Sequence, residues 1–150
     1  MLHDILTGIE DNIVDIIQGM DFSDIDADLS DITVIKGRRQ RGFKAKPPLV
    51  AVYMETSDVN HAQMSNHEVW TVPIVIIGML QKKDPEEGRR ITTELIAKAR
   101  DEVIKGRNLG MNEIRDVKGT GFTPADERAE VGNHIFGAGA TLDVSFTYRL

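Results

Sequence analysis

The longest apolar run in the chain is the feature that most constrains its fold. Residues 69–80 read V-W-T-V-P-I-V-I-I-G-M-L and are rich in β-branched residues, which favour a pleated, buried surface. Pro73 lies inside the run, where a proline would break a helix. The run is also shorter than the roughly 20 apolar residues of a membrane-spanning helix. It therefore predicts a long buried strand, with Pro73 at a bulge or on a side of the strand that needs no ladder donor.

A helix with clear start and stop signals is predicted after this strand. Asp84 suits the N-cap, Pro85 the first helical position, and Glu87 the capping-box position three residues after the cap. Apolar residues recur at helical spacing from 91 to 103, and Gly106 suits the helix end. We expect this strand and helix to form the centre on which the flanking segments pack.

A second amphipathic helix is predicted at the start of the chain. Residues 2–20 place leucine and isoleucine at three- and four-residue steps, with acidic residues on the other face and Gly19 near the end. Two interpretations stay open: a helix of the core, or a helix offered to a partner.

The acidic stretch 21–31, D-F-S-D-I-D-A-D-L-S-D, follows this helix. Its alternating aspartates resemble a calcium-binding loop, but Leu29 stands where that loop needs glycine and Ile35 where it needs the closing glutamate. We expect a solvated acidic linker here.

Two more strands are predicted before the long apolar run. Residues 31–36 alternate weakly, which indicates a short strand. Residues 49–55, L-V-A-V-Y-M-E, begin sharply after two prolines and predict a good strand. We expect 49–55 and 69–80 to form a hairpin joined by a long, polar loop over 56–68.

The C-terminal part is predicted to add two strands. Residues 112–118 suggest a strand with Ile114 and Val117 facing inward, and the glycine-rich residues 119–137 suggest a long loop. The last residues alternate cleanly with period two. Their inward face holds Leu142, Val144, Phe146, Tyr148 and Leu150. The predicted fold is a single α+β domain, with two main helices on one face of a largely antiparallel or mixed sheet.

The histidines are the candidates for a zinc-type metal site. His61 and His67 fall in the predicted 56–68 loop, and His134 lies in the later loop. The H-x5-H spacing matches no familiar zinc pattern, and no cysteine accompanies it. Surface histidines are the expected interpretation, and a metal-dependent hydrolase using these side chains is the alternative from another functional class.

A basic segment stands out because the chain has a net charge of −6. Glycine and a double proline bracket it, which indicates a loop. Its basic residues are Arg38, Arg39, Arg41, Lys44 and Lys46. We expect either a solvated loop or a contact with phosphate or an acidic partner. Without a recognition helix or stacking platform beside it, any nucleic-acid contact would be to the backbone.

Known catalytic motifs are missing from the sequence. It has no cysteine, which excludes disulfides, thiolate metal ligands and cysteine nucleophiles. It has no G-x-S-x-G elbow, Walker loop, dinucleotide fingerprint or zinc signature. The N-terminal residues M-L-H-D-I-L are not those of a signal peptide. We expect neither enzymatic activity nor a cofactor.

The order of these segments resembles that of the tail-terminator, or tail-completion, proteins of long-tailed bacteriophages. The resemblance covers most of the chain. It rests on an N-terminal amphipathic helix followed by P-P-L-V-A-V-Y, V-W-T-V-P-I-V-I-I-G, L-I-A-K-A-R-D-E-V, F-T-P and G-A-G-A-T-L-D-V-S-F-T-Y. It depends on element order, length and strand texture, and on no invariant signature.

The resemblance implies a ring of copies, commonly six, that caps the tail tube, ends tube polymerisation and offers the head-joining surface. Expected partners are the chain itself, the tail-tube protein, a head–tail connector, and a sheath protein if the tail contracts, with DNA passing transiently through the lumen. The expected location is the virion neck, and the host cytoplasm during assembly. The runner-up is another neck component, such as a head-completion adaptor. The family has no catalytic or ligand motif, so no residue role is inherited.

The basic segment yields a first prediction. Because Arg38, Arg39 and Arg41 sit between turn residues, we expect them to serve assembly or DNA passage rather than folding. Changing all three to Ser should leave the melting temperature nearly unchanged while lowering assembly or infectivity. A large loss of thermal stability would instead assign these arginines a structural role.

Overall fold

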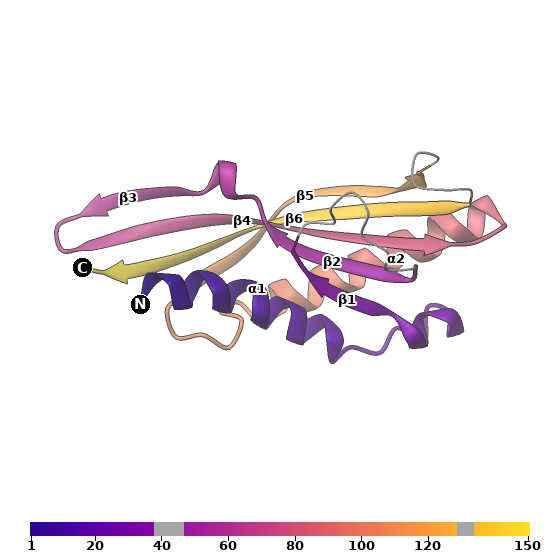
Figure 1. Ribbon diagram of the computed structural model, residues 1–150, viewed down its shortest axis with the longest axis horizontal. Helices are drawn as coiled ribbons and strands as arrows, with labels where there is room; N and C mark the ends of the chain where they lie inside the picture. Colours follow the sequence, from indigo (N-terminus) through magenta and orange to yellow (C-terminus); the bar gives the residue numbers. More distant parts are fainter. Residues whose placement is uncertain (38–46, 129–133) are drawn as a thin grey trace.

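One sheet with helices on a single face makes up the described structure. The computed structural model describes residues 1–37, 47–128 and 134–150. Within them, six strands form a mixed sheet in the order β1-β2-β4-β6-β5, and β3 also pairs with β4. Two α-helices, α1 (Leu2–Gln18) and α2 (Pro85–Lys105), pack on one face of this sheet (Figure 1). The predicted α+β fold is confirmed.

The predicted apolar strand is β4 (His67–Gln81), and it lies at the centre of the sheet. Along one side it pairs antiparallel with β6 (Ile135–Arg149) over its full length. Along the other side it pairs antiparallel with β2 (Leu49–Met54) and then with β3 (Asn60–Met64). The expected antiparallel pairing of the 49–55 and 69–80 segments is confirmed.

Pro73 lies at a point of this strand where no ladder partner needs its missing N–H. Its carbonyl oxygen accepts from the backbone N–H of Glu55 at 2.9 Å, so its backbone faces the side of β2 and β3. On that side the β3 pairing stops at Thr71 and the β2 pairing begins at Ile74. The register with β6 runs through Pro73 without a shift. Of the two predicted solutions, the side without a ladder donor is therefore correct, and no bulge is needed.

Asp84, Pro85 and Gly106 take the N-cap, first helical and C-cap positions of α2, as predicted. The Asp84 side chain accepts from the backbone N–H of Glu86 at 3.1 Å, and Pro85 is the first helical residue. The helix ends at Lys105 with Gly106 as its C-cap. Gly106 is right-handed at φ −69°, however, and the left-handed residue is Arg107 at φ 58°.

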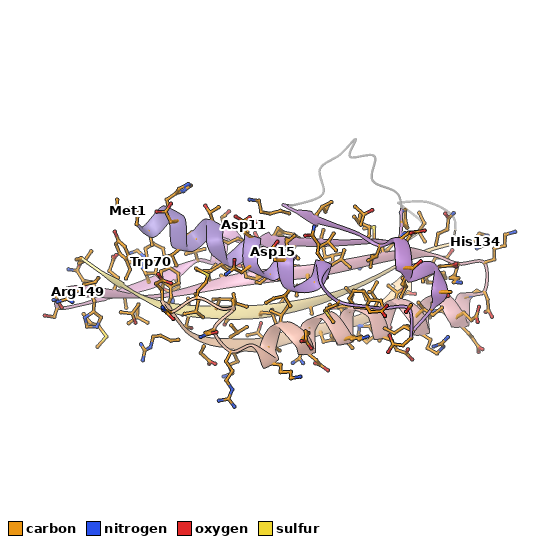
Figure 2. All side chains as sticks on the ribbon, turned by 90° about the horizontal axis from the view of Figure 1, so that it is seen from below. Met1, Asp11, Asp15, Trp70, His134 and Arg149 are labelled. Atoms are coloured by element: carbon orange, nitrogen blue, oxygen red, sulfur yellow. The ribbon has the colours of Figure 1, made fainter. Side chains whose placement is uncertain are left out.

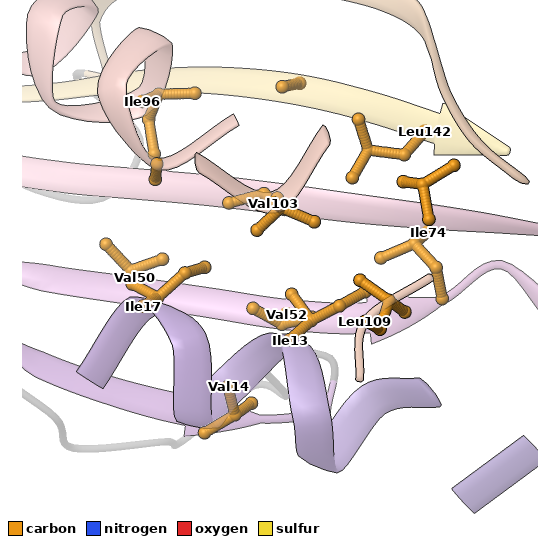
Figure 3. Close-up of a cluster of buried hydrophobic side chains, with 14 of the residues drawn as sticks. Ile13, Val14, Ile17, Val50, Val52, Ile74, Ile96, Val103, Leu109 and Leu142 are labelled. Carbon is orange, nitrogen blue, oxygen red and sulfur yellow. The ribbon is translucent and has the colours of Figure 1, made fainter. Parts of the chain in front are cut away.

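The core lies between the two helices and the sheet. Ile9, Ile13 and Ile17 of α1 are 0% exposed, which confirms the interpretation of α1 as a core helix. Figure 3 shows Ile13 and Ile17 beside Val50 and Val52 of β2, with α2 side chains closing the cluster from the other side. Burial of this single cluster stabilises the fold by the hydrophobic effect.

The acidic stretch after α1 is packed, so the prediction of a solvated linker is wrong. It contains a short 3-10 helix, η1 (Ala27–Asp31), and its Phe22 and Leu29 side chains are 1% exposed. Lys98 binds the Asp24 carboxylate at 2.9 Å, and Lys82 binds those of Asp26 and Asp28 at 2.8 Å each. Two apolar anchors and two lysines hold the stretch on the body of the protein.

Two predicted loops are largely strand. The 56–68 segment holds the 3-10 helix η2 (Thr56–Asp58) and strand β3, which forms a hairpin with β4. The 119–137 loop is also wrong in its described part, since β5 (Ile114–Glu127) continues to residue 127 and β6 begins at Ile135. Three register shifts interrupt the pairing of β5 with β6. Such bulges break the period-two pattern that reveals a strand in sequence.

The short strand β1 (Thr33–Lys36) is confirmed and pairs parallel with β2. Ile114 and Val117 face inward as predicted. On β6, Leu142, Val144 and Phe146 are buried, which confirms the predicted face of the last strand. Leu150 is 62% exposed and lies beyond the end of β6. Its predicted inward position is wrong. The alternation of apolar residues in the sequence extends beyond the part of the sheet that the helices cover, so it does not mark Leu150 as buried.

The buried face of β6 yields a stability prediction. Val144 and Phe146 are 0% exposed, so truncating either to Ala should cost roughly 2–4 kcal/mol of unfolding free energy through lost contacts and a residual cavity. Urea denaturation measures this. Ser145→Ala, on the opposite face of the same strand, is the control and should stay near neutral. Equal stability of all three variants would show that β6 is turned over.

The anchor between Lys82 and Asp26 predicts a pH-dependent stability. The Lys82 ammonium group, by hydrogen bonding, lowers the pKa of the Asp26 carboxyl below its ordinary value of 3.8. The stabilisation is therefore present above that ordinary value and is lost as the pH falls through the folded pKa. Asp26→Asn keeps an oxygen for the N-cap bond to Asp28. It should cost about 1 kcal/mol at neutral pH.

The same variant should lose its disadvantage in acid. Thermal melts at neutral and acidic pH measure the difference between wild type and Asp26→Asn. Asp31→Asn, a substitution at an exposed position of the same short helix, is the matched control. A cost for Asp26→Asn that stays constant across this pH range would contradict the role of the Lys82 ion pair.

Candidate assembly surfaces

The predicted basic segment is not part of the described structure. Arg38, Arg39, Arg41, Lys44 and Lys46 lie outside the described residues. The residue before it, Gly37, donates its N–H to the carbonyl of Val52 at 2.8 Å. Beside Gly37 lies a hollow of about 230 Å³ whose lining includes Glu10 and Glu55. Burial raises the pKa of the Glu10 carboxyl. The last described residue before the basic segment therefore lies near two acidic side chains, Glu10 and Glu55.

The three histidines singled out in the sequence do not converge. His61 lies on β3 and His67 on β4, rather than in a loop. His61 stacks on Trp70 with the ring centroids 4.5 Å apart, and Trp70 and His134 lie at opposite ends of the molecule (Figure 2). Among the residues that the structure describes, no group of three or more His, Cys, Asp or Glu side chains could hold a metal ion.

The face of the sheet opposite the helices is the largest candidate surface. On β4, the even-numbered residues from Val72 to Leu80 are buried under the helices, and the odd-numbered ones are half-buried on the other face. We call this second face the open face. Its β4 row is mostly apolar and holds Val69, Thr71, Pro73, Val75, Ile77 and Met79. Neither α1 nor α2 packs on it (Figures 1 and 2).

The neighbouring β6 row of the open face is polar. Val75 of β4 lies opposite Thr141, Pro73 opposite Asp143, and Val69 opposite Thr147. An apolar stripe along β4 therefore runs beside a polar stripe along β6. The residue pattern of β4 is that of a strand covered on both faces, which reads as a continuous apolar run, whereas β6 alternates like a strand covered on one. The described chain covers only one face of β4.

A hollow of about 250 Å³ interrupts the open face between β4, β5 and β6. Val75, Ile77 and Phe122 contribute apolar lining, and Gly121 and Gly139 lie at it. A side chain on Gly121 would come within 2.7 Å of the Thr141 hydroxyl, so the glycine keeps the hollow open. Phe122 is 38% exposed at its rim. The hollow has the size and lining to receive an apolar side chain from another molecule.

One end of the sheet extends as a three-stranded arm made of β3, the start of β4 and the end of β6. It points toward the end of the molecule where both chain ends lie (Figure 1). His61, Trp70 and Phe146 are cross-strand neighbours in this arm, and their rings form two near-parallel stacks. The buried Trp70 Nε1–H has no hydrogen-bond partner among the described residues. Ring stacking and packing therefore hold Trp70 in place.

The sequence already indicated the open face through the nearly unbroken apolar run of residues 69–80, which is not a functional motif. The 69–80 run is apolar at nearly every position, although the structure buries only alternate residues of it. A run of this kind indicates a strand meant to be covered on both sides. The alternating β6 partner could not reveal the surface, because its polar row is ordinary for a half-buried strand.

Two comparisons with known proteins find no match. No model of a known protein family matches the chain, and a search of curated proteins gives no match. In the described part of the chain, no helix is both long enough and apolar enough to cross a membrane.

Proposed function

We propose that this chain is a structural virion protein that acts like a tail terminator: a ring that caps the tail tube, ends its polymerisation and offers the head-joining surface. The observation that carries the proposal is the apolar stripe of β4 on the open face. Contiguous apolar surface on a protein commonly marks a site of association. The segments on which the resemblance rests form helices and strands in the expected order, except that F-T-P lies within β5 and β3 stands between β2 and β4.

The open face has the features of a contact between copies or with the tube. Half-buried side chains such as Val75 and Ile77 gain burial when another subunit covers them. The hollow beside them offers a pocket for an apolar side chain, and pockets of this kind anchor protein interfaces. The polar β6 row, with Thr141 and Asp143, would form the rim of the contact.

A ring of this kind would end growth by geometry rather than chemistry. Tube subunits add to the exposed face of the last ring of the tube. A terminator that binds this face without presenting a copy of it leaves nothing for the next tube subunit to bind. A closed ring satisfies the heterologous contacts among its own copies. The partners would be the chain itself, the tail-tube protein and a head–tail connector, with a sheath protein where the tail contracts.

The charge distribution suits a lumen through which DNA passes. A net charge of −6 disfavours strong phosphate binding. The basic residues from Arg38 to Lys46 would supply diffuse contacts that release the DNA again. The resulting location is the virion neck, with the host cytoplasm as the site of assembly.

Electron microscopy of the purified protein with tail-tube protein from the same particle tests this function. We expect rings, or caps at the ends of tubes that then stop lengthening. Tubes that grow unchanged with no density at either end would contradict the terminator role. If the protein instead binds the portal side of the head, another neck component becomes the better assignment.

A variant pair tests the open face itself. Val75→Asp places a charge in the apolar stripe and should abolish capping, because the new carboxylate would be buried unpaired at the contact. Its melting temperature should stay close to that of wild type, since Val75 is only half-buried and lies on the face of the sheet away from the core. Glu102→Arg, a charge change at an exposed position of α2, is the control and should cap normally. Capping by both variants would exclude the β4 stripe as the contact.

A further inference from the structure

Among the described residues, three strands pair with only one neighbour: β1, β3 and β5. Of these, β3 and β5 differ sharply in how they are protected against pairing with another molecule. Free strand edges invite such pairing, and proteins usually block them with bulges, prolines and charges. β5 carries all three: its pairing with β6 shifts register three times, Pro124 lies within it, and Lys118 and Asp116 are exposed. This edge of the sheet is poorly suited to receive a further strand.

β3 has none of these protections. Its sequence, N-H-A-Q-M, contains no charged residue and no proline. All five residues are exposed, and its register with β4 is unbroken. Within the described ranges, β4 is the only strand that pairs with it. β3 is therefore an unbroken and uncharged edge, and no described strand pairs with its outer side.

The pairing on the inner side fixes which backbone groups of β3 point outward. Pro73 presents its carbonyl to the β2 and β3 side, and Asn66 presents its carbonyl to Leu150 on the β6 side. Odd-numbered residues of β4 thus direct their backbone groups toward β3, where their partners are Asn60, Ala62 and Met64. The N–H and C=O groups of His61 and Gln63 consequently point away from β4, to the free edge.

We propose that two copies of this chain join through their β3 edges as an antiparallel, two-fold pair centred on Ala62. In this register His61 of each copy lies opposite Gln63 of the other, and both exchange backbone N–H and C=O bonds. Ala62 lies opposite Ala62 of the second copy in the closely spaced position between these bonds. The smallest side chain of the strand thus stands where the two copies approach most closely.

The β3 strand of a second copy fits this edge better than a strand from another protein or another strand of this chain, for two reasons. The edge is uncharged, so apposing it to itself sets no like charges against each other. A two-fold contact also uses both free edges at once and stops there, which is how an unprotected edge is kept from open-ended aggregation. Another short free edge, Thr147–Arg149 of β6 beyond the start of β5, would meet β3 in parallel in a cyclic arrangement, and parallel pairing is slightly weaker.

This inference concerns the protein before it meets a tail tube and goes beyond the proposed function. The β3 edge is separate from the apolar stripe around Val75 and Ile77, so dimer formation and tube capping can fail independently. In the wild type we expect a dimer, with about twice the 16.7 kDa mass of the chain, that dissociates on dilution.

Charge-swapped variants at Ala62 test the register directly. Ala62→Lys and Ala62→Glu each place like charges opposite each other across the two-fold axis, and each variant alone should be monomeric by sedimentation velocity. An equimolar mixture should recover the dimer, because each pair then sets Lys against Glu. Only a contact in which residue 62 faces residue 62 shows this rescue. A mixture that stays monomeric beside a dimeric wild type would overturn the register.

Two controls complete the test. Thr123→Lys places the same charge on the protected edge strand β5 and should leave the dimer intact. Gln63→Pro removes an outward N–H that β4 does not use, so it should fold normally, as circular dichroism and thermal melting would show, and yet be monomeric. A wild-type protein that is monomeric at all concentrations, or a Gln63→Pro variant that folds and still dimerises, would overturn the proposal. Tube capping by the Ala62→Lys monomer would leave the proposed function standing in either case.

Discussion

The pairing of β4 with β6 is the constraint on which the rest of the structure depends. The two strands run antiparallel over 15 residues without a register shift. This ladder aligns Val72, Ile74 and Ile76 with Val144, Leu142 and Ala140 on one face. Because side chains alternate between faces, a slip of one residue would turn this apolar row to the other side. The helix α2 packs on this surface, and α1 completes the core beside β2.

The same ladder creates an asymmetry between the two strands. On the face away from the helices, β4 presents Val69, Pro73 and Val75 where β6 presents Thr147, Asp143 and Thr141. A fold that needed only one covered face would gain nothing from apolar residues on both sides of β4. This asymmetry is the physical reason for which we propose an assembly contact on the open face. It also separates this contact from the β3 edge, where backbone groups rather than apolar side chains are available.

Electrostatic contacts have a local role in this fold. Lys82, before α2, and Lys98, within it, hold the acidic stretch after α1 by binding Asp26, Asp28 and Asp24. Such partly exposed pairs contribute modestly to stability. Phe22 and Leu29 beside them are buried and supply the larger share through the hydrophobic effect. The ion pairs fix where the stretch lies, and the apolar side chains stabilise it there.

The sequence by itself determined the elements whose signals are local. The caps of α2, the apolar periodicity of α1 and the alternation of β6 depend on neighbouring residues, and the structure confirms all three. Only the tertiary structure decided the rest. β3 is a strand because β4 extends far enough to pair with it. The bulges of β5 remove the alternation that would have predicted a strand there. The acidic stretch is held by lysines more than fifty residues away in sequence. The open face and the β3 edge belong to this second class. Whether a side chain or a backbone group is covered depends on which distant segments reach it, and the spacing of residues along the chain does not record that.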